Sequence, residues 1–341
     1  MPNDEMNQRR NWGSKVAFIF AASGSAIGLG SIWRFPLFVG LNGGAAFVFT
    51  YIVAVFFIGF TVMLAELTIG RHAQKSPVPA FKHIKPRTPW VLVGYMGVIC
   101  GVFILSYYSV IAGWAAGYFY KTITGAFPKQ VSWEDSATLF AQFAADTLQV
   151  LVCLAAIIAL TTYVISKGVK GGIERWSKIL MPVLFVLIIV LAIRALTLPG
   201  AKNGLLFYLK PVFSDFSPTI LFFAVGQAFF SLSLGMGTMM TYGSYIPKRE
   251  NLVSSAGWVC FSTVLIAILA GIIIFPTLFD TLQLTPEQFK QDFVVDTGLM
   301  FQVFPIIISK MPGGAIFGIL FFALLLIAAL TSTISMLEVP T

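Results

Sequence analysis

Glycine and serine interrupt an apolar segment near the start of the chain, in the run AASGSAIGLGSIWRFP from Ala21 to Pro36. Gly24, Gly28 and Gly30 weaken a helix at a place where lipid cannot replace a lost backbone hydrogen bond. An unwound turn there frees backbone carbonyls for a small hard cation, and the N-terminus of a half-helix attracts an anion such as a carboxylate. These residues therefore favour the binding of sodium together with a zwitterion.

A second long apolar segment, TILFFAVGQAFFSLSLGMGTMMTYGSYI, is interrupted near its middle by Ser231, Ser233, Gly235 and Gly237. The two interrupted segments are the first and the sixth in chain order. Paired interruptions at corresponding places in two halves indicate an inverted-repeat transporter whose site lies at the membrane midplane. The alternative is that small residues four apart only let helices pack closely. Two interruptions, both with hydroxyls beside the glycines, favour the transporter.

The serines of both interruptions are candidate ligands. Ser25, Ser231 and Ser233 offer neutral oxygen atoms that need no deprotonation to bind a cation or to complete a substrate shell. Isolated serines in membrane helices more often bond their own backbone. We predict a binding role because the three lie in the two interrupted segments.

The amino-acid composition indicates that much of the chain lies in lipid and not in water. Mean hydropathy is +0.87, and 57% of the 341 residues are hydrophobic while only 11% are charged. These values are far from those of a soluble domain and predict an all-α membrane protein, because helices satisfy their own backbone hydrogen bonds in lipid. The formal net charge of +8 is explained by a basic cytoplasmic face, so we expect no nucleic acid partner.

Eight apolar segments are long enough to cross about 30 Å of hydrocarbon as helices. We expect them near 14–38, 42–69, 89–123, 147–166, 174–196, 218–246, 252–277 and 314–341. The third is too long for a simple crossing and is expected to tilt or to project from the bilayer. The connection before the eighth, with TPEQFKQDF and VFPIIISK, is expected to carry short helices. The chain divides into a polar segment, 1–13, and a transmembrane domain, 14–341.

The distribution of lysine and arginine predicts the orientation. Fourteen lie on the side of the N-terminus and seven on the opposite side, while Arg34 lies within the first segment. The positive-inside rule therefore places the N-terminus in the cytoplasm. The N-terminal residues are polar and contain no short apolar run before a cleavage site, so we expect no signal peptide.

Cysteine and histidine offer little chemistry. Cys100, Cys153 and Cys260 are scattered in apolar segments, where they are expected to act as small hydrophobic residues. His72 and His83 share one polar loop, which argues against a zinc site or a histidine-based catalytic site. No set of nucleophile, base and orienting group is evident, so we expect no enzyme.

Longer motifs carry a family resemblance. The runs GSAIGLGSIWRFP, NGGAAFVFTYI and AELTIGRHAQ are similar to the first two helices of the neurotransmitter:sodium symporter family, and especially of its bacterial amino-acid transporters. The resemblance continues through SYYSVIAGW, FFSLSLGMG, ILAGIIIFP and ALTSTISMLE, and so covers the chain from Arg9 to its end.

The resemblance implies a leucine-transporter-like fold, in which five helices are repeated upside down, and sodium-driven alternating access in a bacterial cytoplasmic (inner) membrane. The first repeat is expected at about 14–196 and an incomplete second repeat at about 218–341. About eight transmembrane helices of an expected eleven or twelve are then present.

The resemblance also implies a second sodium site, built from neutral oxygen atoms. Its backbone carbonyls are those of Gly24, Ile27 and Ala328, and its hydroxyls are those of Thr331 and Ser332. All five residues are compatible with such a site.

The first sodium site departs from the family pattern. It is expected to use the Ala26 carbonyl, the Ser231 hydroxyl and the carboxylate of the substrate. Ser31 and Thr263 stand where relatives have amide or acidic oxygens. A hydroxyl has a shorter reach and a weaker dipole than an amide carbonyl. We therefore expect the first site to bind sodium weakly.

A chloride site is implied only in an incomplete form. Ala267 stands where relatives place a glutamate or a chloride-coordinating serine. Tyr51, Gln227 and Ser231 still match the rest of such a site. The resemblance therefore leaves chloride as a possible second ion beside sodium.

The family's substrate positions fall on the first, third, sixth and eighth segments. They are Ser25, Ala26, Gly28, Leu29, Gly30, Ile104, Tyr108, Phe230, Ser231, Ser233, Met236, Ser332 and Met336. Tyr108 is expected to hydrogen-bond the substrate carboxylate, and Phe230 is expected to close over the substrate from outside. Monoamine carriers need a carboxylate where this chain has Gly28, so the resemblance implies an amino acid. The flexible apolar walls Met236 and Met336 favour a hydrophobic or aromatic one.

Four residues are implied as gates or braces. Arg34 matches the outer gate, whose acidic partner belongs to a tenth helix, and Arg9 and Trp12 match the inner gate. Glu66 matches a carboxylate that braces the broken helices. The alternatives are that Arg34 is an interfacial anchor and that Glu66 is an anion at the membrane surface.

A rival hypothesis concerns the last residues, MLEVPT, which fall within the eighth segment. The chain would then be a truncated fragment that does not transport, or a membrane binding partner of a full-length carrier. The residues do not indicate the oligomeric state or which amino acid is bound.

Overall fold

The computed structural model describes residues 11–128, 130–212, 216–283 and 299–341, and its regular elements are helices. Six described segments are long and apolar enough to cross a membrane: Ala45–Ala73 (α4, η2 and α5), Val91–Ile123 (α7), Thr147–Ser166 (α9), Val169–Leu196 (η3 and α10), Leu252–Leu282 (α14) and Gly314–Glu338 (α17). A seventh is the bent pair Lys15–Ala26 (α2) and Gly30–Leu41 (η1 and α3).

The remaining predicted segment, the sixth in chain order, is present as two short helices. These are α12, Pro218–Ser231, and α13, Thr238–Ser244. All eight segments thus lie where the hydropathy of the sequence predicts them. The fifth begins earlier than predicted, at Val169, because the turn η3 (Val169–Glu174) continues α10 (Arg175–Leu196) toward its N-terminus.

The first break separates α2 from the turn η1, Gly30–Arg34, which continues into α3, Phe35–Leu41. Ile27 ends α2 with φ −91° and ψ 74°, outside the helical region. The two halves meet at an angle of 49°. The glycines that weaken this segment therefore coincide with a sharp bend of the chain.

The second break separates α12 from α13. Three residues there have positive φ: Ser233 at 54°, Gly235 at 78° and Gly237 at 78°. A left-handed conformation costs glycine little but strains a residue that carries a Cβ atom. The two glycines explain why the helix unwinds here, and Ser233 carries strain of the kind found at functional sites.

The described turns η1, η2 and η3 are all π-helical. The turn η2, Val55–Gly59, interrupts α4 (Ala45–Ala54) and α5 (Phe60–Ala73). A Cβ atom placed on Gly59 would lie 2.5 Å from Leu232 Cδ1, in the break between α12 and α13. Isolated π turns often mark functional sites, and this one lies against the unwound segment.

Three short helices lie outside the predicted segments: α6 (Pro77–Ile84), α8 (Trp133–Ala145) and α11 (Ala201–Leu209). The N-terminus of α8 has a clear signal, because Ser132 and Asp135 form a reciprocal capping box. Of the predicted helices before the eighth segment, VFPIIISK lies in α16, Leu299–Lys310. The run TPEQFKQDF lies outside the described residues.

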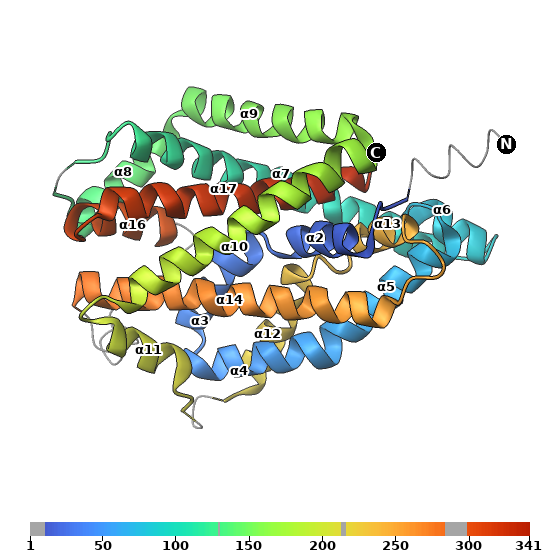
Figure 1. Ribbon diagram of the computed structural model, residues 1–341, viewed down its shortest axis with the longest axis horizontal. Coiled ribbons are helices and arrows are strands. Elements are labelled where there is room, and N and C mark those ends of the chain that lie inside the picture. Colours follow the sequence, from blue (N-terminus) through green and yellow to red (C-terminus); the bar gives the residue numbers. More distant parts are fainter. Residues whose placement is uncertain (1–10, 129, 213–215, 284–298) are drawn as a thin grey trace.

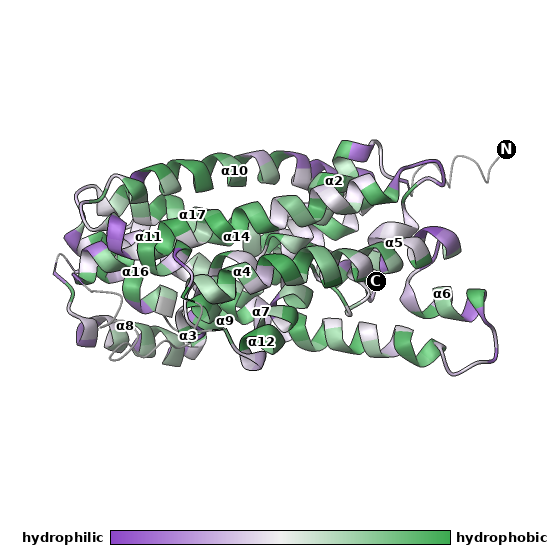
Figure 2. Ribbon diagram, turned by 90° about the horizontal axis from the view of Figure 1, so that it is seen from below, coloured by the Kyte–Doolittle hydropathy of each residue, from purple (hydrophilic) through white to green (hydrophobic). Residues whose placement is uncertain are grey.

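The long helices lie side by side along the long axis of the molecule (Figure 1). The start of α2, α6 and the end of α17 lie at one end, here called the N-terminal end, and α8, α11 and α16 lie at the other. Figure 2 shows that hydrophobic residues follow the long helices and that hydrophilic residues gather toward the two ends. Large apolar side chains such as Phe57 and Phe222 face outward, 76% and 75% exposed, as expected where lipid is the solvent.

Candidate functional site

A small cavity lies where both breaks meet two unbroken helices. Its walls come from the break after α2, from α7, from the break after α12 and from α17. Its volume is about 10 Å³, which is room for about one water molecule. Eleven of the thirteen predicted substrate residues line it: Ser25, Ala26, Gly28, Gly30, Ile104, Tyr108, Phe230, Ser233, Met236, Ser332 and Met336.

The two other predicted residues lie just behind the wall. The Leu29 backbone N–H donates to the Tyr108 hydroxyl at 2.7 Å. The Ser231 hydroxyl accepts a hydrogen bond from Gln227 Nε2 at 2.9 Å. The structure thus brings all thirteen residues to one place, and their role in binding a substrate remains a prediction.

Hydroxyl groups from α2, from the break after α12 and from α17 form one cluster on the cavity wall. The Ser233 hydroxyl donates to the Ser25 carbonyl at 3.0 Å, and the Ser332 hydroxyl donates to the same carbonyl at 3.1 Å. The Ser25 hydroxyl donates to Ser233 Oγ at 3.3 Å. These bonds connect the two broken helices with each other and with α17.

Gly28 leaves the space that Tyr108 and Ser332 occupy. A Cβ atom placed on Gly28 would collide with the Tyr108 hydroxyl and with Ser332 Oγ. Tyr108 is 3% exposed and comes from α7. A hydroxyl and a backbone N–H that meet at a break between half-helices form a polar corner suited to a carboxylate.

The ring of Phe230 separates the cavity from a larger space toward the end opposite the N-terminal end. That outer space has a volume of about 450 Å³ and is lined by Trp33, Arg34, Leu37, Phe38, Tyr107, Val110, Ile111, Trp114 and Phe230. The Arg34 guanidinium lies over the rings of Phe230 and Phe38, at 4.3 and 4.7 Å from their centroids. No described carboxylate pairs with Arg34. This placement fits the predicted lid and outer gate, and Phe38 is a contact that the motifs do not indicate.

Residues of the predicted second sodium site lie on both sides of the contact between α2 and α17. The Thr331 hydroxyl lies 3.1 Å from the Ala328 carbonyl. A Cβ atom on Gly24 would lie 3.3 Å from Thr331 Cβ, so α2 and α17 touch here. Ile27 follows directly where α2 ends. The described residues contain no cluster of three histidine, cysteine or acidic side chains that suits a metal ion, so neutral oxygens are the available ligands.

The predicted first sodium site is less complete. The Ser31 hydroxyl donates to the Ala26 carbonyl at 3.3 Å, so two of its residues meet. The Thr263 hydroxyl instead donates to the Val259 carbonyl of its own helix at 2.8 Å. Serine and threonine commonly bond back to their own helix in this way.

Tyr51, Gln227 and Ser231 lie together next to this site. Gln227 Nε2 donates to the Gly30 carbonyl at 2.8 Å as well as to Ser231 Oγ. The Tyr51 hydroxyl lies beside Ser231, without good hydrogen-bonding geometry to any described residue. Both amide hydrogens of Gln227 are therefore used within the protein.

Glu66 reaches the second break from α5. Its Oε1 accepts a hydrogen bond from the Gly235 backbone N–H at 2.7 Å, and the side chain is buried. Unwinding leaves backbone groups without helical partners, and each costs free energy when buried. Glu66 replaces one of these partners, as expected for a brace rather than for an anion at the membrane surface.

Trp12 closes the N-terminal end. Its Nε1 donates to the Tyr242 carbonyl at 3.1 Å, and its ring packs edge-on against those of Tyr242, Tyr245 and Phe18. The side chain is 5% exposed. The segment before α2 is thereby held against α13. Arg9, the other predicted inner-gate residue, lies outside the described residues.

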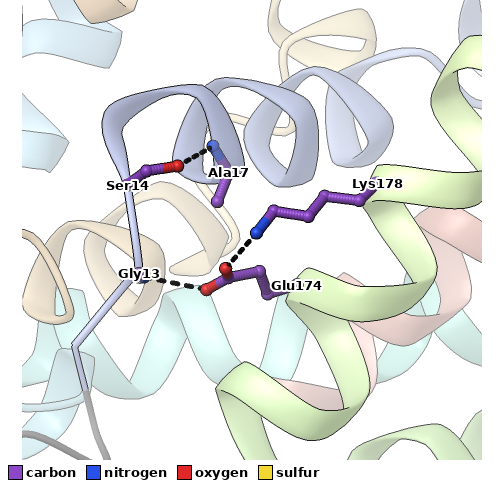
Figure 3. Close-up of polar contacts among 5 residues, drawn as sticks. All are labelled: Gly13, Ser14, Ala17, Glu174 and Lys178. Carbon is purple, nitrogen blue, oxygen red and sulfur yellow. Dashed lines mark hydrogen bonds and ion pairs between the residues drawn. The ribbon is translucent and has the colours of Figure 1, made fainter.

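Glu174 is a functional candidate that the sequence does not indicate. It is buried at the start of α10, and its Oε2 accepts a hydrogen bond from the Gly13 backbone N–H at 2.9 Å (Figure 3). Its Oε1 pairs with Lys178 Nζ at 2.6 Å. Acidic residues are common near helix N-termini, so position 174 alone gives no sign of a contact with Gly13.

We expect Glu174→Ala to release the segment before α2, because the Gly13 N–H then loses a charged acceptor. Such a hydrogen bond contributes about 1.5–3 kcal/mol. Amide hydrogen exchange around Gly13, measured by mass spectrometry, should accelerate roughly tenfold or more. Lys178→Ala, which keeps the bond to Gly13, should change the exchange little. Equal acceleration in both variants would contradict this role of Glu174.

Comparisons with known proteins agree with this geometry. A model of the sodium:neurotransmitter symporter family matches residues 9–144 and 137–341. The chain is 40% identical over 328 residues to the uncharacterized sodium-dependent transporter YhdH of Bacillus subtilis, covering 96% of this chain and 71% of that protein. It is 38% identical over 341 residues to an uncharacterized sodium-dependent transporter of Haemophilus influenzae, covering 97% and 73%.

A solved structure shares the fold. The crystal structure of MhsT in complex with L-phenylalanine matches with a TM-score of 0.87 at 46% identity, over 97% of this chain and 73% of that chain. This confirms the predicted leucine-transporter-like fold with its broken first and sixth helices. The chain therefore belongs to the sodium:neurotransmitter symporter family and is a multi-pass membrane transporter, not an enzyme.

Proposed function

We propose that this protein imports a hydrophobic or aromatic amino acid together with sodium, by alternating access. The observation that carries the proposal is the cavity at the two breaks, which has one polar corner and one apolar wall. Tyr108 and the Leu29 N–H form the polar corner. Ile104, Met236 and Met336 form the apolar wall.

The polar corner suits the carboxylate of an amino acid. The Tyr108 hydroxyl and the N–H groups at the start of η1 are donors, and the positive end of the half-helix dipole points the same way. The missing side chain at Gly28 leaves the space that the Tyr108 and Ser332 hydroxyls occupy and adds no negative charge. A substrate that lacks its own carboxylate would leave these donors unpaired, which is costly in a closed site.

The apolar wall suits a hydrophobic side chain. Methionine is flexible and polarizable, so Met236 and Met336 can adapt to aliphatic or aromatic groups. Phe230 would cover the substrate on the side of the outer space. MhsT, which shares the fold, was crystallised with L-phenylalanine, and this supports an aromatic amino acid among the substrates.

Sodium would couple to the substrate through the break after α2. The second site at Gly24, Ile27, Ala328, Thr331 and Ser332 shares Ser332 with the cavity wall. Sodium bound there would hold α2 against α17 and so favour the closed cavity. By linkage, substrate binding would then favour sodium binding by the same factor.

The first sodium site would contribute less, because Ser31 and Thr263 offer hydroxyls where relatives have amide or acidic oxygens. Chloride is left out of the proposed coupling, because Gln227 already donates both amide hydrogens within the protein. The excess of lysine and arginine on the side of the N-terminus supports an N-terminus in the cytoplasm.

Uptake into proteoliposomes tests the proposal. The protein, as its gene encodes it, is reconstituted, and radiolabelled phenylalanine is supplied with either an inward sodium gradient or potassium in its place. We expect sodium-dependent accumulation that excess tryptophan, leucine or methionine inhibits and that excess aspartate does not. Uptake that is equal in potassium, or that aspartate inhibits as strongly as leucine, would contradict the proposal.

A further inference from the structure

A groove lies at the end of the molecule opposite the N-terminal end, where α10 leads into α11 (Figure 1). Its volume is about 700 Å³, and its lining is apolar except for Lys202 and Lys210. Leu196, Leu206 and Leu209, which belong to this lining, are 46%, 42% and 50% exposed. The groove therefore presents a continuous apolar surface on the outside of the molecule.

The opposite face of α11 is fixed to α14, so the groove has a rigid wall. A Cβ atom on Gly204 would lie 2.5 Å from the Phe275 carbonyl oxygen, which shows how closely the two helices approach. The Tyr208 hydroxyl donates to two backbone carbonyls of α14 at 3.3 and 3.2 Å. The Tyr208 ring stacks on Phe275 with centroids 5.3 Å apart. A ligand in the groove would thus meet a preformed surface, which lowers the cost of binding.

The two lysines add positive charge at the edge of the groove. Lys202 and Lys210 are exposed and stand near the two ends of α11, about 12 Å apart along the helix axis. Neither forms an ion pair with a described residue, and no described carboxylate lines the groove. Asp280, which lies beside the turn before α11, instead accepts a hydrogen bond from the Gly200 N–H at 2.6 Å. The two positive charges are therefore not neutralised within the described part of the chain.

An apolar groove with two ammonium groups at its edge matches one class of ligand, an amphiphile with a negative head group. The groove lies toward an end of the long apolar helices, where hydrophilic residues gather (Figure 2), and this is the level of the lipid head groups. A small anion would leave the leucines uncovered. A zwitterionic lipid would bring its own cation close to the lysines, whereas an anionic lipid would bring only negative charge.

We propose that this groove binds one anionic phospholipid, with an acyl chain along the leucines and the phosphate between Lys202 and Lys210. The proposal goes beyond amino-acid transport and requires neither sodium nor substrate. Because the groove exists only in the folded protein, a lipid bound there stabilises the folded state. The lipid would also hold the end of α10, at Leu196, against α11.

Photo-crosslinking from inside the groove tests the proposal. The protein, as its gene encodes it, carries p-benzoylphenylalanine in place of Leu206 and is reconstituted in equal amounts of phosphatidylglycerol and phosphatidylcholine. Mass spectrometry then measures the ratio of the two crosslinked lipids. Each lysine near a membrane surface favours anionic lipid about fivefold. We therefore expect phosphatidylglycerol to be crosslinked at least about tenfold more than phosphatidylcholine.

Two double variants show whether the lysines of the groove cause the preference. In Lys202→Gln/Lys210→Gln the ratio should fall to nearly one. Lys85→Gln/Lys170→Gln is the matched control, because it removes the same charge from two exposed lysines outside the groove, and it should leave the ratio unchanged. Phosphatidylglycerol should also raise the melting temperature in detergent more than phosphatidylcholine does, and Lys202→Gln/Lys210→Gln should lose this difference.

Three results would overturn the proposal. The first is a ratio near one in the protein with both lysines, or an equal fall in both double variants. The second is loss of the phosphatidylglycerol crosslink when inorganic phosphate replaces chloride at the same ionic strength, which would identify a site for free anions. The third is a crosslink to another part of the protein and to no lipid, which would show that the chain itself covers the groove.

Discussion

Gly28→Ala should abolish amino-acid binding while the protein still inserts and folds. The added methyl group would collide with the Tyr108 hydroxyl and with Ser332 Oγ. Tyr108 would then have to leave the Leu29 N–H, which lies 2.7 Å away. We expect the affinity for the preferred amino acid to fall at least about a hundredfold, which corresponds to about 2.7 kcal/mol. Equilibrium binding of labelled phenylalanine in sodium measures the effect.

The stability of the variant shows whether the effect is local. The Gly28 carbonyl accepts hydrogen bonds from the Ser31 and Ile32 N–H groups at 3.1 and 3.2 Å, and alanine keeps this carbonyl. Thermal unfolding in detergent should shift by only a few degrees, because the single Leu29–Tyr108 hydrogen bond that is displaced contributes about 0.5–1.5 kcal/mol. Gly28→Asp should be at least as damaging for binding, because it adds a negative charge beside the substrate carboxylate. Unchanged affinity in Gly28→Ala would show that the amino acid binds elsewhere.

The two breaks could be predicted from the sequence because their causes are local. Gly235 and Gly237 adopt positive φ, a conformation that glycine adopts at little cost. Their place in an apolar segment can be recognised from the sequence alone, without knowledge of which residues lie near them in space. The resemblance then supplied the partners in α7 and α17, and the structure brings Tyr108 and Ser332 to the same cavity.

Contacts between distant parts of the chain could not be predicted in this way. Glu174 accepts a hydrogen bond from Gly13, 161 residues away in sequence. Position 174 reads only as an ordinary acidic residue at the start of a helix. The contact between Gly101 and Met236 also depends on how α7 and the second break lie against each other. Neither contact has a local signal in the sequence, because a single sequence does not show which helix faces meet.

The short helices and the π turns differ in how well the sequence predicts them. The capping box of α8, Ser132 with Asp135, is a local signal, and it could have indicated that helix from the sequence. The turns η1, η2 and η3 have no comparable signal. The π turn at Gly59 lies against Leu232 of the second break, a residue distant in sequence.

Glu66→Ala should impair both the stability of the protein and its uptake of amino acid. Glu66 Oε1 accepts the Gly235 N–H at 2.7 Å, and in the alanine variant this buried donor has no replacement. The loss costs about 1.5–3 kcal/mol for a charged acceptor. We expect a lower apparent melting temperature and at least tenfold less sodium-driven uptake, because Gly235 directly precedes the cavity residue Met236.

Glu66→Gln separates the hydrogen bond from the charge. The amide oxygen still accepts from the Gly235 N–H, while the negative charge is lost. If the main role of Glu66 is to satisfy the unwound backbone, Glu66→Gln should recover most of the stability and uptake that Glu66→Ala loses. Melting curves and initial uptake rates of the two variants, measured side by side with the unaltered protein, decide the matter. Equal losses in both variants would show that the charge of Glu66, and not its bond to Gly235, is what the transporter requires.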